Sequence, residues 1–273
     1  MPRYRLTIEY HGGPFLGWQR QAEGPTVQGR LERALAALDT APDGTPPLVQ
    51  GAGRTDTGVH ATGQVAHVDL ARAWTGYRLQ MALNHHLRPD PVAVLQATTV
   101  PAAFHARFSA TGRQYRYVIV NRAAPLTLEA GLVWRVARPL DSAAMSEAAA
   151  AMLGRHDFTT FRAAQCQAAS AIKTLDRFEI ARTGERIVCT LEARSFLHNQ
   201  VRSLVGSLER VGSGAWAPAD MADALAARDR SRCGPVAPPN GLCLTAVTYP
   251  PTAPTAAEDP AGVTADQAPP AGS

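Results

Sequence analysis

The sequence has almost no lysine, only four cysteines and no long hydrophobic run. Lys173 is the only lysine among the 27 basic residues, so the other 26 are arginines. No stretch approaches the roughly 18 consecutive apolar residues of a membrane-spanning helix, and the N-terminal MPRYRLTIEYHGG lacks the apolar core of a secretion signal. These absences predict a cytoplasmic protein without a membrane segment.

The cysteines do not have the spacing of a metal site. Cys166, Cys189, Cys233 and Cys243 are far apart and form no CxxC or CxxH pair, so we expect no structural zinc and no other metal. Without a signal peptide, disulfides are not expected either. We predict reduced, mostly buried thiols.

The composition is that of a globular chain with a distinct tail. The 273 residues are 45% hydrophobic and 18% charged, enough to build a sizeable core. Residues 251–273 are rich in proline and alanine and contain no aromatic residue, so we expect a disordered acidic tail. This tail has three acidic residues and no basic one, and the net charge of +4 therefore leaves +7 for residues 1–250.

The arginine excess has two explanations. The planar guanidinium group suits phosphate and stacks on bases, which favours a nucleic-acid partner. A GC-rich coding bias would produce the same excess. Composition alone leaves both open.

Strand and helix patterns interleave along the body of the chain. Alternation predicts strands at 4–10, 47–52, 64–70, 92–100, 114–120, 175–181, 187–193 and 242–249. Helical spacing predicts helices at 27–38 with Thr26 as the N-cap, at 76–87, at 140–153 ended by Gly154, at 196–211 and at 218–228. This order, with hairpins, predicts the α+β class.

The most unusual segment is GAGRTDTGVHATGQ at residues 51–64. Its glycines allow a tight turn, and an aspartate held beside an arginine stays ionised. Arg54, Asp56 and His60 therefore indicate an active-site loop. The alternative is a structural turn in which Asp56 bonds its own backbone.

A second segment, FHARFSATGRQYRY at residues 104–117, alternates arginine with aromatic residues. Aromatic rings stack on unpaired bases while arginines hold phosphates, so the pattern is typical of an RNA-contacting strand. The alternative is an ordinary half-buried strand with its tyrosines in the core. The arginines concerned are Arg107, Arg113 and Arg116, and the tyrosines are Tyr115 and Tyr117.

Two further segments are less specific on their own. In SFLHNQVR (195–202), Arg202 interrupts an apolar helix, shares a flank with His198, and needs an acidic partner if it is buried. In APPNGLCL (237–244), a proline-rich turn enters the last strand.

Taken together, these segments resemble the TruA family of tRNA pseudouridine synthases. The resemblance lies in GRTDTGVHA, FHARFSATGRQYRY, FLHNQVRSLVGSL and APPNGLCL, with YRLTIEYHGGPFLGWQRQ and HDFTTFRAAQC as further support. The segments occur in the family's order and cover residues 3–250. One departure is Thr57, where many members have alanine, and a small polar residue fits there.

The resemblance implies roles for five residues. Asp56 matches the catalytic aspartate, and Arg202 matches the arginine that pairs with it. Tyr115 matches the tyrosine that stacks on the target uracil, and Leu242 resembles the apolar residue beside that tyrosine. Arg54 matches the arginine that helps to extrude the target base.

The resemblance also implies the fold and the reaction. The expected fold has two similar α/β halves, residues 1–110 and 111–250, around a mixed, largely antiparallel sheet with a central basic cleft. The enzyme would be a homodimer that isomerises uridine to pseudouridine at positions 38, 39 and 40 of the tRNA anticodon arm. It would need no cofactor, because the C1′–N1 bond breaks, C1′ rejoins at C5, and nothing is gained or lost. We further expect Arg107, Arg113 and Arg116 to hold the tRNA backbone.

Two other classes of function fit the sequence less well. A non-catalytic RNA-binding module would have no use for a carboxylate facing RNA. A hydrolase using Asp56 and His60 would need a nucleophilic serine or threonine, and no GxSxG turn is present.

Overall fold

The computed structural model describes residues 1–40 and 44–251. Its strands are Arg3–Tyr10 (β1), Gln50–Gly51 (β2), His60–Asp69 (β3), Val92–Val100 (β4), Gly112–Asn121 (β5), Trp134–Val136 (β6), Gly154–Asp157 (β7), Ile172–Thr183 (β8), Arg186–Ala193 (β9) and Leu242–Thr248 (β10). Its α-helices are Val27–Ala36 (α1), Gly76–Leu87 (α2), Ser142–Ala150 (α3), Gln200–Gly212 (α4) and Pro218–Ala227 (α5).

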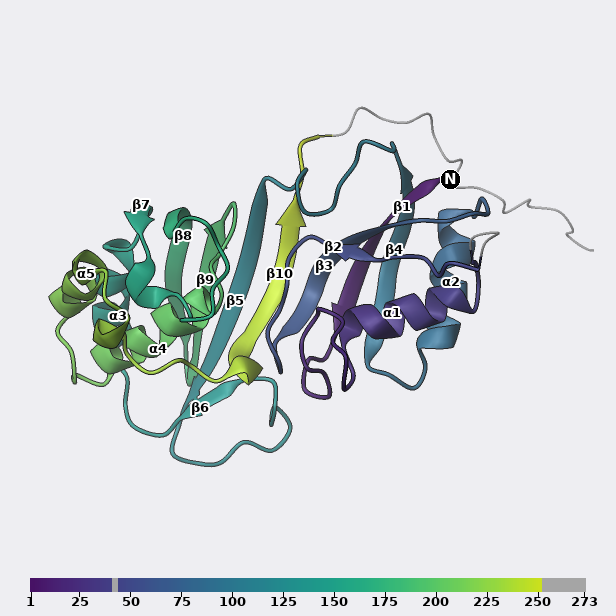
Figure 1. The fold of residues 1–273 in the computed structure, drawn as a ribbon. Coiled ribbons are helices and arrows are strands. Elements are labelled where there is room, and N and C mark those ends of the chain that lie inside the picture. The colour runs from purple at the N-terminus through teal and green to yellow at the C-terminus, as the bar shows by residue number, and fades with distance from the viewer. Residues whose placement is uncertain (41–43, 252–273) are drawn as a thin grey trace, which may run out of the picture.

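One mixed sheet runs the length of the molecule (Figure 1). Its strand order is β4-β1-β3-β10-β5-β9-β8-β7, with β2 beside β3 and β6 beside β5. Only the β10–β3 and β5–β6 pairs are parallel among the described strands. The predicted α+β class with a mixed, largely antiparallel sheet is confirmed. The last strand, β10, lies between β3 and β5 and thereby joins the N-terminal strands to the C-terminal ones.

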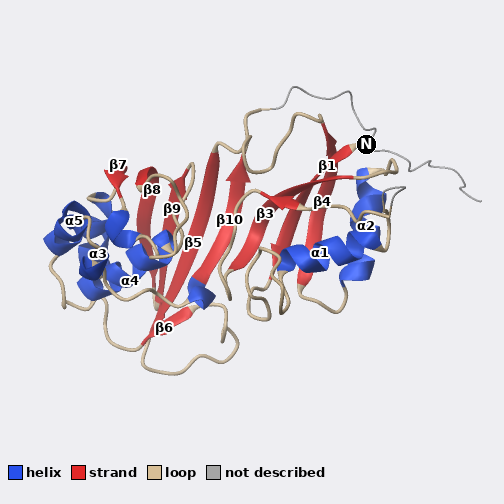
Figure 2. Ribbon diagram, in the orientation of Figure 1, coloured by secondary structure: helices blue, strands red, loops and turns tan. Residues whose placement is uncertain are grey.

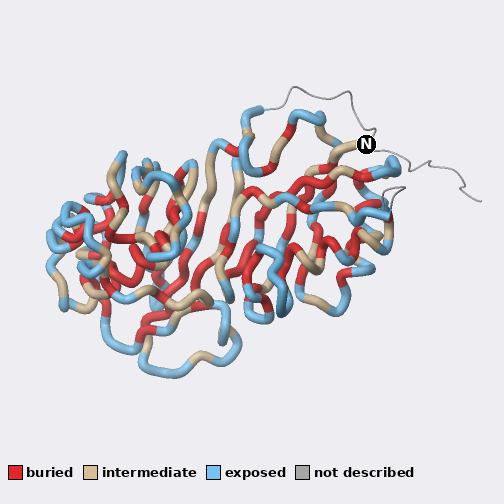
Figure 3. The backbone as a smooth tube through the Cα atoms, in the orientation of Figure 1, coloured by how far each residue is buried: buried red, intermediate tan, exposed pale blue. Residues whose placement is uncertain are grey.

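The helices form two groups at opposite ends of the sheet (Figure 2). Helices α1 and α2 lie near β1 and β4, and α3, α4 and α5 lie near β8. The inward side chains of all five helices belong to one apolar core with the sheet, while two smaller clusters combine strand residues with residues of neighbouring loops. Figure 3 shows the buried backbone following the strands and the inner sides of the helices.

Several predicted elements are confirmed closely. Helix α2 and strand β4 have the predicted bounds. Thr26 caps α1 by accepting a hydrogen bond from the Gly29 N–H, and Leu31 and Leu35 are buried. Along β5, Tyr115 and Tyr117 are buried whereas Arg116 is exposed, as strand alternation predicts.

Other predicted bounds were wrong. The helix expected from 196 begins only at Gln200, because Asn199 adopts the left-handed conformation (φ 61°) and 195–199 form a loop. The helix expected at 140–153 spans Ser142–Ala150 and begins where the Asp141 side chain caps it. The strand expected at 47–52 is only two residues long, and β3 begins four residues earlier than expected. Strands β6 and β7 were not predicted.

The remaining expectations have mixed outcomes. All four cysteines are free, but Cys189 alone is buried and the others are half-buried, so the prediction of mostly buried thiols was wrong. None of the described helices is long and apolar enough to cross a membrane. The predicted tail lies outside the described residues beyond position 251. The division into halves at 110 and 111 stays a prediction.

Candidate active site

A cleft of about 1080 Å³ contains most of the predicted site residues. This volume is slightly above the roughly 300–1,000 Å³ of small-molecule pockets. Its walls come from both halves of the chain, including residues within the segments 48–59, 105–108, 165–168 and 195–202.

The loop carrying Asp56, residues 52–59, is held by close backbone approach. Gly17 has φ +92°, and a Cβ built on it would lie 2.5 Å from the Thr55 carbonyl oxygen. This absence of a side chain lets the Trp18 N–H donate to that oxygen at 3.0 Å. The hydroxyl groups of Tyr10 and Thr55 are also hydrogen-bonded, at 2.8 Å. Asp56 therefore projects from a fixed backbone.

Two donors face the two oxygens of Asp56. Arg202 Nη1 lies 3.6 Å from Oδ2, and His198 Nε2 lies 3.3 Å from Oδ1. Both distances exceed the roughly 2.7–2.9 Å of a charge-assisted hydrogen bond, and the Asp56 side chain is 26% exposed. The carboxylate is thus oriented and still open to an incoming group. These contacts also argue against the alternative in which Asp56 bonds its own backbone.

Arg202 is held independently of Asp56. Its Nε donates to the Ala237 carbonyl oxygen at 2.8 Å, and its Nη1 donates to Asn199 Oδ1 at 3.0 Å. Asn199 is also the residue with positive φ, so one strained position both turns the chain into α4 and anchors the arginine. The acidic partner predicted for Arg202 is Asp56.

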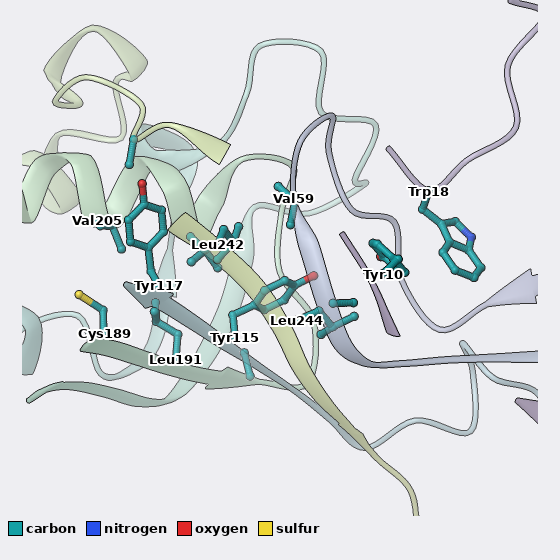
Figure 4. Close-up of a cluster of buried hydrophobic side chains, with 14 of the residues drawn as sticks. Tyr10, Trp18, Val59, Tyr115, Tyr117, Cys189, Leu191, Val205, Leu242 and Leu244 are labelled. Carbon is teal, nitrogen blue, oxygen red and sulfur yellow. The ribbon is translucent and has the colours of Figure 1, made fainter. Parts of the chain in front are cut away.

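Tyr115 lies against the side of the cleft formed by the sheet. Its ring extends from β5 in the direction of Tyr10 (Figure 4) and packs edge-on against Phe196, with ring centroids 5.2 Å apart. Burial, together with the nearby Asp56 charge, raises the pKa of the Tyr115 hydroxyl, which therefore stays neutral. Leu242 is buried at the start of β10 and also lines the cleft.

The four arginines predicted to contact RNA differ in exposure and in whether they line the cleft. Arg54 and Arg107 are exposed and line the cleft. Arg113 also lines it, but its guanidinium donates to the carbonyl oxygens of Ala52 (2.8 Å), Arg107 (2.9 Å) and Arg194. Arg116 is exposed but does not line the cleft, because it points to the opposite face of β5 from Tyr115.

The histidine beside Asp56 is His198 and not His60. His60 is buried, and its Nδ1 accepts from the Gly12 N–H at 3.0 Å. It is therefore part of the support of the N-terminal loop and not a partner of Asp56, so the pairing required by a hydrolase does not form. His198 was recognised only as a neighbour of Arg202. The four-residue spacing was the available signal, although it lies in a loop and not on a helix.

The arrangement can orient a carboxylate beside a base stacked on a tyrosine. Among residues 1–40 and 44–251, no three His, Cys, Asp or Glu side chains gather to hold a metal ion. The site brings together Asp56, Arg202, Tyr115, Leu242, Arg54, Arg107 and Arg113, and leaves out Arg116.

Comparisons with known proteins all find the same family. A family model described as tRNA pseudouridine synthase matches residues 7–109 and again 148–250. The chain is 60% identical to the tRNA pseudouridine synthase A of Maricaulis maris over 250 residues, covering 92% of this chain and 99% of that relative. It is 58% identical to the enzyme of the same name from Afipia carboxidovorans over 249 residues, covering 91% of this chain and all of that relative.

Proposed function

The chain belongs to the tRNA pseudouridine synthase family, and from this premise we propose that it isomerises uridine to pseudouridine at positions 38, 39 and 40 of the tRNA anticodon arm. The observation that supports this most directly is the position of Asp56 in the cleft, with Arg202 on one oxygen and the ring of Tyr115 close by. The matching of the family model to both parts of the chain agrees with a pseudouridine-synthase fold made of two similar halves.

The reaction begins when the target uridine leaves the base stack, which costs a few kcal/mol. Stacking on Tyr115 returns about 1–3 kcal/mol of that cost, and Leu242 provides an apolar contact on the same side. Arg54, at the rim, helps to extrude the base. These contacts place the ribose of the target next to Asp56.

The Asp56 carboxylate then drives the exchange of bonds at C1′. The C1′–N1 bond breaks and its electron pair stays on the uracil, which turns in the cleft. C5 then bonds to C1′, and the C5 proton is lost while N1 gains one. Whether Asp56 attacks the sugar, adds to the base or removes a 2′ proton, it must act as a carboxylate, and Arg202 lies beside it. The raised pKa of Tyr115 disfavours a phenolate, so its ring acts as the stacking partner.

The partners follow from the same proposal. The substrate is the anticodon arm of tRNA, held by the exposed arginines of a body with net charge +7. The enzyme works in the cytoplasm as a homodimer, without a cofactor. Light scattering on the purified chain tests the dimer, because a mass equal to that of one chain would contradict it.

The reaction itself is tested by tritium release from C5 of uridine in a tRNA transcript. We expect release from a transcript with uridines at positions 38–40, and none from the same transcript with cytidine at those positions. Release that is equal from both transcripts would contradict the proposed target sites. No release from any tRNA despite tight binding would point to the RNA-binding alternative.

A further inference from the structure

A chain of polar side chains connects helix α1 to Arg54. Glu32 and Gln28 are on the buried face of α1, only 6% and 5% exposed. Gln28 Nε2 donates to Glu32 Oε1 at 2.9 Å, and Gln28 Oε1 accepts from Gln19 Nε2 at 2.9 Å. Gln19 Oε1 in turn accepts from Arg54 Nε at 3.0 Å. We call Glu32, Gln28, Gln19 and Arg54 the amide chain.

The orientation of Gln28 is determined by backbone groups. Its Oε1 also accepts from the Arg20 N–H at 2.9 Å, and its Nε2 also donates to the Val49 carbonyl oxygen at 3.0 Å. A backbone N–H can only donate and a carbonyl can only accept, so a flipped amide would face both wrongly. All four hydrogen-bonding positions of Gln28 are thus satisfied in one orientation.

The orientation of the Gln28 amide determines the orientation of the Gln19 amide. Because the oxygen of Gln28 faces Gln19, Gln19 must present its NH₂ group there and its own oxygen on the other side. That oxygen meets Arg54 Nε. Gln19 is itself exposed, so its direction comes from Gln28 and not from packing.

The contact uses only one edge of the arginine. Within residues 1–40 and 44–251, Nε is the one Arg54 nitrogen that has a hydrogen bond. Both Nη groups, which form the outer fork of the guanidinium, are left for a partner from outside the chain. An exposed arginine otherwise loses rotamer freedom when it binds RNA, and Gln19 restricts that freedom in advance.

We propose that Gln19, oriented by Gln28, is a positioning residue that holds the Arg54 guanidinium ready to extrude the target uridine. This inference rests on the proposed function, in which Arg54 acts during extrusion. The ligand of the two Nη groups is the RNA strand around the target base.

The test is single-turnover tritium release by Gln19→Met, which keeps the length of the side chain and removes its hydrogen bonds. We expect the rate on a tRNA whose target uridine is paired in the stem to fall about tenfold. The matched control is Gln21→Met, since Gln21 is also exposed and, within the described residues, its side chain hydrogen-bonds to the Leu16 carbonyl oxygen and not to Arg54. It should keep the wild-type rate. Equal losses in both variants would overturn the proposal.

A second substrate separates positioning from a general structural role. Extruding the target uridine costs less free energy when the base opposite it is mismatched. On such a tRNA, the loss of rate in Gln19→Met should therefore shrink below about twofold. A defect that persists in full on the mismatched tRNA would overturn the proposal. Failure of the proposed function looks different, because the wild type would then release no tritium from either tRNA.

A double-mutant cycle tests whether Gln19 acts through Arg54. In an Arg54→Ala enzyme, Gln19→Met should cause no further loss of rate. A further tenfold loss, or full activity of Arg54→Ala alone, would contradict the proposal. Gln28→Met should reproduce the Gln19→Met defect at a temperature where thermal unfolding shows it to be folded, and a wild-type rate there would contradict the role given to Gln28.

Discussion

Arg202 Nη1 and Asp56 Oδ2 lie 3.6 Å apart although they come from opposite halves of the chain. Asp56 lies in the loop before β3, and Arg202 lies in the first turn of α4. The arginine is fixed by the Ala237 carbonyl oxygen and by Asn199, and the aspartate by the backbone around Thr55. The geometry of the carboxylate therefore depends on how the two halves meet.

Asp56→Asn should abolish the reaction and spare binding. The amide has nearly the same size but neither attacks the sugar nor removes a proton, so we expect tritium release to fall by at least about a thousandfold. A filter-binding assay with the same tRNA is the control, and affinity should stay within about threefold of wild type. Equal release by both proteins would refute the assignment of Asp56.

His198 should contribute through its contact with Asp56 Oδ1. Removing the donor in His198→Ala frees one side of the carboxylate, and we expect kcat to fall about tenfold with little change in KM. His198→Gln keeps a donor of similar reach and should recover part of the loss. Steady-state kinetics of the three proteins decide this, and an unchanged kcat in His198→Ala would show that Arg202 orients Asp56 alone.

The sequence predicts the elements of the fold better than their junctions. Hydrophobic spacing located α2 and β4 because their own side chains determine their burial. It placed the start of α4 too early, since Phe196 and Leu197 continue the apolar pattern while Asn199 breaks the helix with a positive φ. The insertion of β10 between β3 and β5 depends on pairing between distant segments, which periodicity does not record.

For the candidate site, too, the sequence identified residues better than the contacts between them. The motif resemblance identified Asp56, Arg202 and Tyr115, and the structure brings all three to one cleft. Residue type alone did not distinguish a free arginine from one that is already hydrogen-bonded, as Arg113 is to three carbonyl groups. The sequence placed His198 near Arg202 but did not show its contact with Asp56, because that contact joins two segments far apart in the chain.

The salt dependence of tRNA binding should distinguish the three arginines of β5 and its preceding turn. Arg107→Gln should weaken binding and reduce the slope of log Kd against log salt by about one, since an exposed cleft arginine releases one counterion. Arg113→Gln should leave the slope unchanged and lower the melting temperature, because it leaves three carbonyl groups without their donor. The sequence predicted that Arg116 also holds the tRNA backbone. Because Arg116 lies on the opposite face of β5, we now expect Arg116→Gln to change neither the affinity for tRNA nor the slope. Slopes measured for all four proteins check this, and a flat wild-type slope would contradict the basic-cleft model.

Acid should destabilise the folded protein through His67. This side chain is only 2% exposed, and its Nδ1 accepts from the Ala106 N–H at 3.2 Å. Burial lowers its pKa to about 4, helped by the charges of Arg3 and His105 and opposed by Asp69. In the unfolded chain the pKa of histidine is about 6.5.

Between these two values the unfolded state binds more protons than the folded state, so the free energy of unfolding falls as the pH falls. The contribution of His67 to stability is complete above about pH 6.5 and is lost as the pH falls toward 4. His67→Gln keeps an acceptor for Ala106 and cannot be protonated, and it should reduce the drop in melting temperature between pH 7 and pH 5. The drop should not vanish, because His60 and His105 also have lowered pKa values. His85→Gln, on the exposed side of α2, is the control and should change nothing. An equal drop in His67→Gln and wild type would show that His67 does not set the acid sensitivity.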